Sequence, residues 1–155
     1  MRFGAYSEEV IANIDDLKIF PRNFSYEEAA GFSVAAQTAY VSLVERANIL
    51  EEQTVLILGA TGGVGLAAIQ LANAIGAKVI AVCSTKRKQK AAIKAGAKYA
   101  LGYENMINEV KEITQKEGVD IIYDPIGGEY FLNALKIIKW GGKVLIVGFA
   151  SGSIP

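Results

Sequence analysis

The sequence predicts an α/β fold: a doubly wound parallel sheet of the Rossmann type, with helices on both faces. Two observations lead to this prediction. Apolar segments of strand length alternate with helical segments over residues 54–147, and this alternation is typical of parallel sheets built from right-handed crossovers. The segments VLIL and VLIV are near-continuous apolar runs, as expected of strands buried on both faces.

The first 24 residues do not follow this alternation. They predict two short strands, at residues 4–11 and 17–20, before a break at Pro21-Arg22-Asn23. Two isolated strands have no obvious partners of their own. We therefore interpret this segment as the tail of a larger domain and place the sheet domain in residues 25–155.

Two helices are expected before the sheet. Residues 25–28 (SYEE) have the S-x-x-E form of a capping box, which predicts a helix that continues to Phe32. The spacing of apolar residues predicts a second helix over residues 33–46.

The sheet and its helices are predicted from the remaining apolar segments. Strands are expected at residues 54–58, 78–83, 99–102, 120–123 and 143–147. Helices are expected between them, at residues 66–75, 85–95, 105–116 and 130–139. Gly76 and Gly96 follow the first two of these helices, where a left-handed residue commonly ends a helix.

The segment from Ala60 to Gly65 (ATGGVG) is predicted to be a dinucleotide-binding turn. It has the strand–turn–helix context of the G-x-G-x-x-G pattern, with alanine in the first slot. Gly62 would let the backbone approach a diphosphate, and Gly65 would let the helix pack closely on the strand. The helix would direct its unpaired N–H groups and positive dipole end at the phosphates. The alternative is a glycine turn that serves packing alone.

The end of the second strand predicts which dinucleotide is bound. NAD-binding domains commonly have an acidic residue there, about 20 residues after the glycines. Here the position is Ser84, and residues 62–100 contain no Asp or Glu. The segment STKRKQK offers hydroxyl donors and positive charge to a 2′-phosphate. We therefore expect NADP(H), with Ser84, Thr85 and Lys88 at the phosphate; the alternative is a solvated basic helix face.

Composition excludes several classes of function. The 155 residues are 52% hydrophobic and 21% charged, with zero formal net charge, so we expect a globular protein without general affinity for nucleic acid or membrane surfaces. One cysteine and no histidine leave no Cys/His zinc site and no Ser-His-Asp triad. No apolar run reaches the ~20 residues of a membrane helix, and the N-terminus lacks a signal-peptide pattern. A cytoplasmic location is expected.

The chain resembles zinc-independent quinone oxidoreductases of the medium-chain dehydrogenase/reductase superfamily, the zeta-crystallin-like group. The matching stretches are SYEEAAGFSVAAQTAYVSLVERANI, VLILGATGGVGLAAIQLANAIGAKVIAVCST, GVDIIYDPIGGEYF and WGGKVLIVGFASGSIP. The resemblance implies an NADPH-dependent reductase that passes hydride to a quinone or another α,β-unsaturated carbonyl. It also implies that residues 1–24 are the tail of a truncated N-terminal, GroES-like domain. Residues 25–155 would then be an NADP-binding domain that is truncated at its C-terminus. Such a fragment is expected to have little activity alone.

The resemblance also implies roles for single residues. Thr38 matches a threonine near the nicotinamide, Tyr103 a tyrosine beside the adenosine ribose and its phosphate, and Phe149 with Ala150 the loop that lines the nicotinamide; packing roles are the alternative for each. Asp124 is expected to shape the turn after its strand. No catalytic residue is identified and no metal is expected. The expected cofactor-binding residues are Thr38, Ala60, Gly62, Gly63, Val64, Gly65, Ser84, Thr85, Lys88, Tyr103, Phe149 and Ala150.

Other functions compete with this interpretation. Exposed sheet edges favour association, so a non-catalytic nucleotide-binding or interaction module is one alternative, as a homodimer or bound to a missing domain. The enoyl-reductase part of a larger synthase shares these motifs. An NAD-linked alcohol dehydrogenase is disfavoured by Ser84 and by the missing zinc ligands. A small quinone or enone is the expected substrate partner.

Overall fold

The computed structural model describes residues 6–152. It divides into two compact units, Met1–Phe32 and Ser33–Pro155. In the described part of the first unit, residues 6–24 form one short 3₁₀ helix, η1 (Ile14–Asp16), and no strand. The two strands expected at residues 4–11 and 17–20 are therefore wrong over their described residues. Most of these side chains are exposed, and two short strands without an apolar face to bury are not stable on their own.

The first long helix, α1 (Tyr26–Tyr40), begins at the predicted capping box. The Ser25 N–H donates to the Glu28 carboxylate over 2.8 Å, and the Glu28 N–H donates to Ser25 Oγ over 3.2 Å. This reciprocal pair confirms the capping box. The prediction of two separate helices, one ending at Phe32 and the next over residues 33–46, is wrong. Instead α1 continues past Phe32 and passes into a π-helical segment, η2 (Val41–Arg46).

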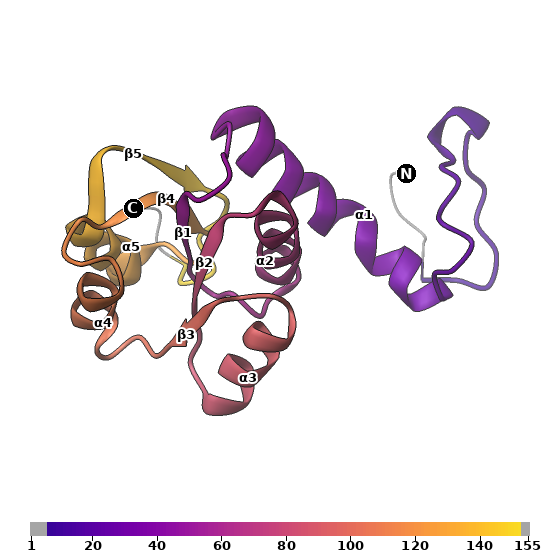
Figure 1. Ribbon diagram of the computed structural model, residues 1–155. Coiled ribbons are helices and arrows are strands. Elements are labelled where there is room, and N and C mark those ends of the chain that lie inside the picture. The colour runs from indigo at the N-terminus through magenta and orange to yellow at the C-terminus, as the bar shows by residue number, and fades with distance from the viewer. Residues whose placement is uncertain (1–5, 153–155) are drawn as a thin grey trace. The chain divides into compact units, whose positions relative to one another are not determined.

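Residues 33–152 form the predicted parallel sheet, whose described part has five strands in the order β3-β2-β1-β4-β5 (Figure 1). This arrangement confirms the predicted fold class. The strands are β1 (Thr54–Ile57), β2 (Lys78–Val82), β3 (Tyr99–Leu101), β4 (Val119–Asp124) and β5 (Ile138–Ile146).

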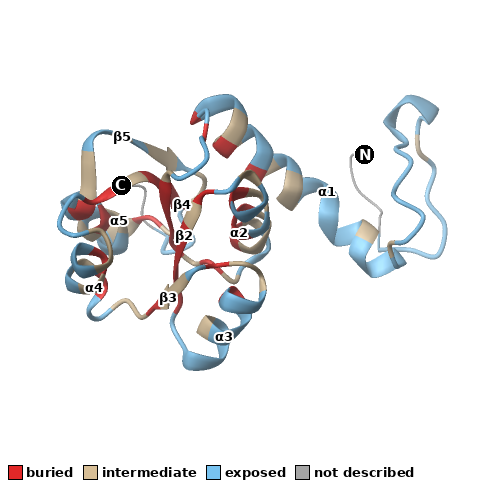
Figure 2. Cartoon of the chain, in the orientation of Figure 1, coloured by how far each residue is buried: buried red, intermediate tan, exposed pale blue. Residues whose placement is uncertain are grey.

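Helices cover both faces of this sheet. On one face lie α2 (Gly63–Ile75) and α3 (Lys86–Lys94), and on the other α4 (Met106–Ile113) and α5 (Gly128–Ala134). Side chains alternate accordingly, because Val55 and Ile57 of β1 pack with α2 while Leu56 packs with α4. Buried residues concentrate on the strands and the inner helix faces (Figure 2). Gly76 and Gly96 have φ values of 95° and 114°, which confirms the predicted left-handed helix ends.

The last strand begins earlier than expected. The predicted helix over residues 130–139 ends at Ala134, a 3₁₀ turn η3 (Leu135–Ile137) follows, and β5 starts at Ile138. Ile138 pairs with Val119, but the next pairing is Lys143 with Ile121, so residues 139–142 bulge from the ladder. Gly141 (φ 74°) permits this bulge. The expected strand over residues 143–147 corresponds to the second part of β5.

Within residues 6–152, none of the helices combines the length and apolar character needed to cross a membrane.

Candidate functional site

The glycine turn joins β1 to α2 at the carboxyl edge of the sheet. Gly59 has a left-handed φ of 54°, and its carbonyl accepts the Gly62 N–H over 3.0 Å. Gly62 is the N-cap, and α2 begins at Gly63, three residues before the predicted start. The first N–H groups of α2 have no intrahelical acceptor, and the N-cap Gly62 supplies no side-chain acceptor to them. Ala60 is buried and donates its N–H to the Val82 carbonyl.

Three glycines of this turn differ in the space around them. A Cβ atom on Gly65 would lie 2.7 Å from the Gly59 oxygen and 2.8 Å from two backbone atoms of Ala60, so Gly65 is needed for close helix packing, as predicted. Among residues 6–152, a Cβ on Gly62 would meet only the Gly59 oxygen, at 3.5 Å, and one on Gly63 only the Ala35 methyl, at 4.0 Å. The protein's own packing therefore leaves open space beside Gly62 and Gly63.

A lysine and a serine side chain lie next to each other just beyond the end of β2. Lys88 Nζ lies 3.3 Å from Ser84 Oγ and donates to it. Thr85 is the N-cap of α3, and its hydroxyl oxygen accepts the Lys88 N–H over 3.3 Å. Ser84 and Lys88 are exposed and adjacent, so this pair offers a positive charge and a hydroxyl hydrogen to an anion. The preceding Cys83 is buried, and burial raises the pKa of its thiol.

Tyr103 connects the loop after β3 to the glycine turn. Its hydroxyl oxygen accepts the Gly59 N–H over 2.9 Å. Its ring contacts that of Tyr130 in α5, with ring centroids 4.2 Å apart. Burial raises the pKa of Tyr103 above its usual value near 10, so the phenol is neutral at physiological pH.

The turn after β4 is organised by a buried carboxylate. Asp124 is fully buried; Oδ1 accepts the N–H of Ile126 (2.7 Å) and of Gly127 (2.9 Å), and Oδ2 lies 3.1 Å from the Gly127 nitrogen. These bonds confirm the expectation that Asp124 shapes its turn. The loop after β5 is attached to the same turn, because the Ala150 N–H donates to the Pro125 carbonyl over 3.1 Å. Phe149, beside Ala150, is half exposed.

Thr38 lies on α1, one turn beyond Ala35, whose methyl is the nearest atom to the Gly63 position. The Thr38 hydroxyl donates to the Val34 carbonyl over 2.8 Å, and the residue is half-buried. Its oxygen remains available as an acceptor.

The structure thus brings most predicted site residues to the carboxyl edge of the sheet. Ala60 to Gly65 form the turn, with Val64 half-buried in the first turn of α2, and Tyr103 is bonded to that turn. Ser84 and Lys88 form a second group at the end of β2. Gly59 and Tyr130, which both contact Tyr103, were not predicted from the sequence. A glycine that directly follows an apolar strand signals a left-handed turn and could have indicated Gly59; no local signal indicates Tyr130.

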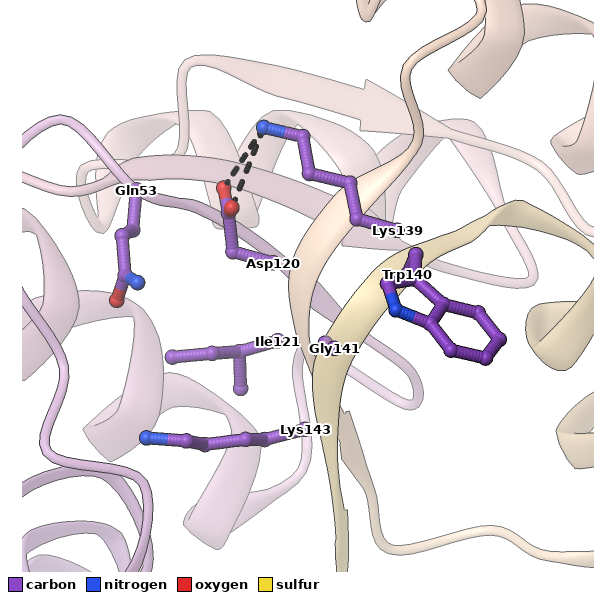
Figure 3. Close-up of a pocket in the computed structure, with 8 residues that line it drawn as sticks. Gln53, Asp120, Ile121, Lys139, Trp140, Gly141 and Lys143 are labelled. Atoms are coloured by element: carbon purple, nitrogen blue, oxygen red, sulfur yellow. Dashed lines mark hydrogen bonds and ion pairs between the residues drawn. The ribbon is translucent and has the colours of Figure 1, made fainter.

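A separate cavity of about 80 Å³ lies at the opposite, amino end of the strands (Figure 3). Its charged side chains are already engaged: Lys139 lies 3.2 Å from the Asp120 carboxylate, and Lys143 donates to the Ala47 carbonyl. Trp140 directs its ring away from Asp120. We therefore do not place the functional site there. The residues that line the cavity are Gln53, Asp120, Ile121, Lys139, Trp140, Gly141, Gly142 and Lys143.

No group of three or more His, Cys, Asp or Glu side chains within residues 6–152 is arranged to hold a metal ion.

Comparison with known proteins identifies relatives of the chain. Residues 63–155 match the zinc-binding dehydrogenase family. The chain is 40% identical to a quinone oxidoreductase-like protein 2 homolog of Nematostella vectensis, over 98% of this chain and 42% of that protein. It is 34% identical to quinone oxidoreductase 1 of Escherichia coli, over 97% of this chain and 47% of that protein.

A solved structure has the same fold. The crystal structure of Escherichia coli quinone oxidoreductase complexed with NADPH superimposes with a TM-score of 0.82 at 33% identity, over 89% of this chain and 43% of that one. The chain thus spans less than half the length of these relatives. The matches confirm the resemblance to quinone oxidoreductases of the medium-chain dehydrogenase/reductase superfamily. The chain belongs to the zinc-binding dehydrogenase family.

Proposed function

We propose that this chain binds NADPH and forms the cofactor-binding part of a quinone oxidoreductase-like enzyme, which passes hydride to a quinone or another α,β-unsaturated carbonyl. One observation carries the proposal. The packing of residues 6–152 leaves open space beside Gly62 and Gly63, at the start of α2, where no side chain caps the helix. A diphosphate fits this position, because a helix N-terminus presents N–H groups and a positive dipole end to an anion.

The Ser84–Lys88 pair supports NADPH rather than NADH. An NADH-binding domain commonly has a carboxylate at this position to accept the ribose hydroxyls, and a carboxylate would repel a 2′-phosphate. Here the end of β2 carries a hydroxyl 3.3 Å from an ammonium group. Both donate to phosphate oxygens through charge-assisted hydrogen bonds.

The nicotinamide end of the proposed site is formed by Thr38, Phe149 and Ala150. The Thr38 oxygen is available to accept an N–H from a carboxamide, and the half-exposed Phe149 ring offers an apolar wall that excludes water. When bound, NADPH supplies the hydride. The residues of this chain bind and orient the cofactor, and we assign none of them a proton transfer.

The substrate class is part of the proposal and rests on the names of the relatives, which are oxidoreductases. Because the chain spans less than half of those proteins, we propose that the 155 residues alone reduce quinones slowly or not at all. A steady-state assay with NADPH and a small quinone tests this point, and turnover equal to that of a full-length relative would refute it.

Calorimetric titration with NADPH and with NADH tests the cofactor assignment. We expect NADPH to bind roughly 10- to 100-fold more tightly, because each hydrogen bond to a charged group contributes about 1.5–3 kcal/mol. Ser84→Ala and Lys88→Met should each reduce this preference. Lys90→Met is the matched control on the same helix, since Lys90 is exposed and outside the proposed site. Equal affinity for the two nucleotides, or a preference for NADH, would refute the assignment.

A further inference from the structure

Tyr103 bridges three segments that are distant in the sequence. It follows β3, its hydroxyl accepts a hydrogen bond from Gly59, 44 residues away, and its ring contacts Tyr130 of α5. The loops after β1 and β3 and the start of α5 are therefore joined through one side chain. The ring contact restricts where the hydroxyl can lie, because a tyrosine side chain has only two rotatable angles.

Gly59 controls the geometry of the glycine turn. Its φ of 54° turns the chain away from β1, and its carbonyl accepts the Gly62 N–H. The same carbonyl stands 2.7 Å from the position of a Cβ on Gly65, so Gly59 sets how closely α2 approaches. A rotation at Gly59 would therefore move both Gly62 and the first turn of α2, where the diphosphate is proposed to bind. The Gly59 N–H is held by the Tyr103 hydroxyl.

We propose that Tyr103 is a positioning residue, which keeps the glycine turn in the conformation that binds nucleotide by accepting the Gly59 N–H. The inference rests on the proposed function and deepens it. Without the hydroxyl, the Gly59 N–H has lost its acceptor and the turn samples other conformations. Apparent affinity falls in proportion to the fraction of molecules in the competent conformation.

The family resemblance places Tyr103 beside the adenosine ribose and its phosphate, and positioning of the turn differs from direct contact with that 2′-phosphate. A positioning residue acts on the diphosphate turn, so its loss weakens NADPH and NADH by the same factor. A direct ligand of the 2′-phosphate acts on NADPH alone. The ratio of the two dissociation constants therefore separates the two roles.

The test compares Tyr103→Phe with the unaltered chain. Phenylalanine keeps the ring against Tyr130 and removes only the acceptor. We expect both dissociation constants to rise by roughly two- to tenfold, the range of a single hydrogen bond, with their ratio unchanged and with faster exchange of the Gly59 amide hydrogen. Tyr99→Phe, which removes a hydroxyl from β3 itself, is the matched control and should alter neither affinity. Ser84→Ala should change the ratio.

Each outcome decides the proposal. Unchanged affinity for both nucleotides in Tyr103→Phe refutes it, even if the variant is less stable to urea. A loss confined to NADPH replaces positioning with direct phosphate contact. If Tyr103→Phe fails to fold, Tyr130→Leu provides the second variant, because it removes the ring support and leaves the hydroxyl; equal weakening of NADPH and NADH is again expected. If the unaltered chain binds neither nucleotide, the proposed function fails first, which is a distinct result.

Discussion

Alanine substitution at Gly62 should weaken cofactor binding while leaving the fold intact. The φ of Gly62 is −72°, which alanine adopts without strain, and the nearest atom to the new Cβ would be the Gly59 oxygen, at 3.5 Å. Alanine is a poorer N-cap than glycine, so we expect a loss of at most about 1 kcal/mol in the free energy of unfolding. The methyl group would occupy the space proposed for the diphosphate, and NADPH affinity should fall by at least about tenfold, or 1.4 kcal/mol.

Gly65→Ala provides the contrast within the same turn. Its Cβ would lie 2.7–2.8 Å from three backbone atoms of Gly59 and Ala60, and these atoms cannot move aside by a change of rotamer. Overpacking costs about 1–3 kcal/mol, of which roughly 1 kcal/mol is offset by the higher helix propensity of alanine. Because the three atoms belong to the backbone, we expect the upper end of this range, a net loss of about 2 kcal/mol. Gly65→Ala should therefore destabilise the fold more than Gly62→Ala does.

Urea denaturation followed by circular dichroism gives the free energy of unfolding, and calorimetry with NADPH gives the dissociation constant. Gly63→Ala, whose Cβ would lie 4.0 Å from the nearest side chain, is a second variant on the open side of the turn. If Gly62→Ala bound NADPH as tightly as the unaltered chain, the space beside Gly62 would not be the diphosphate site. If Gly65→Ala were as stable as Gly62→Ala, the packing argument would be wrong.

Two further predictions concern buried polar groups. Asp124→Asn should lower the free energy of unfolding by about 1–3 kcal/mol in urea. Asparagine keeps the Oδ1 acceptor of Ile126 and Gly127 but loses the negative charge, and an amide nitrogen, which donates, would replace Oδ2, 3.1 Å from the Gly127 nitrogen; an unchanged midpoint would contradict this. Tyr123→Phe should leave stability at neutral pH unchanged or raise it by about 1 kcal/mol, because the buried Tyr123 hydroxyl has no hydrogen-bond partner within residues 6–152. Burial raises the pKa of Tyr123 from 10 to about 12. The folded state therefore retains a proton that the unfolded state releases, and stability that is present below pH 10 is lost as pH rises toward 12. The difference between Tyr123 and Tyr123→Phe in urea titrations should show this loss, and parallel pH profiles would contradict it.

Local signals predicted much of the molecule. The capping box at Ser25 and the left-handed glycines at 76 and 96 depend on contacts within a few residues, so the sequence contains all that they need. The alternation of apolar strands and helices likewise predicted a parallel sheet covered on both faces. In the candidate site, Ser84 directly precedes the N-cap Thr85 and Lys88 lies in the first turn of α3, so the two residues are neighbours within a few positions of the sequence.

Other features of the fold depend on packing between segments that are distant in the sequence. No local sequence pattern predicts such packing. The strand order, the bulge in β5 and the lack of strands in residues 6–24 follow from which neighbours each segment finds. The bond from Gly59 to the Tyr103 hydroxyl joins residues 44 positions apart, and Tyr130 meets Tyr103 because β3 ends and α5 begins at the same edge of the sheet. Short-range hydrogen bonds and periodicity are encoded in neighbouring residues, whereas these contacts exist because the folded chain brings its crossovers together.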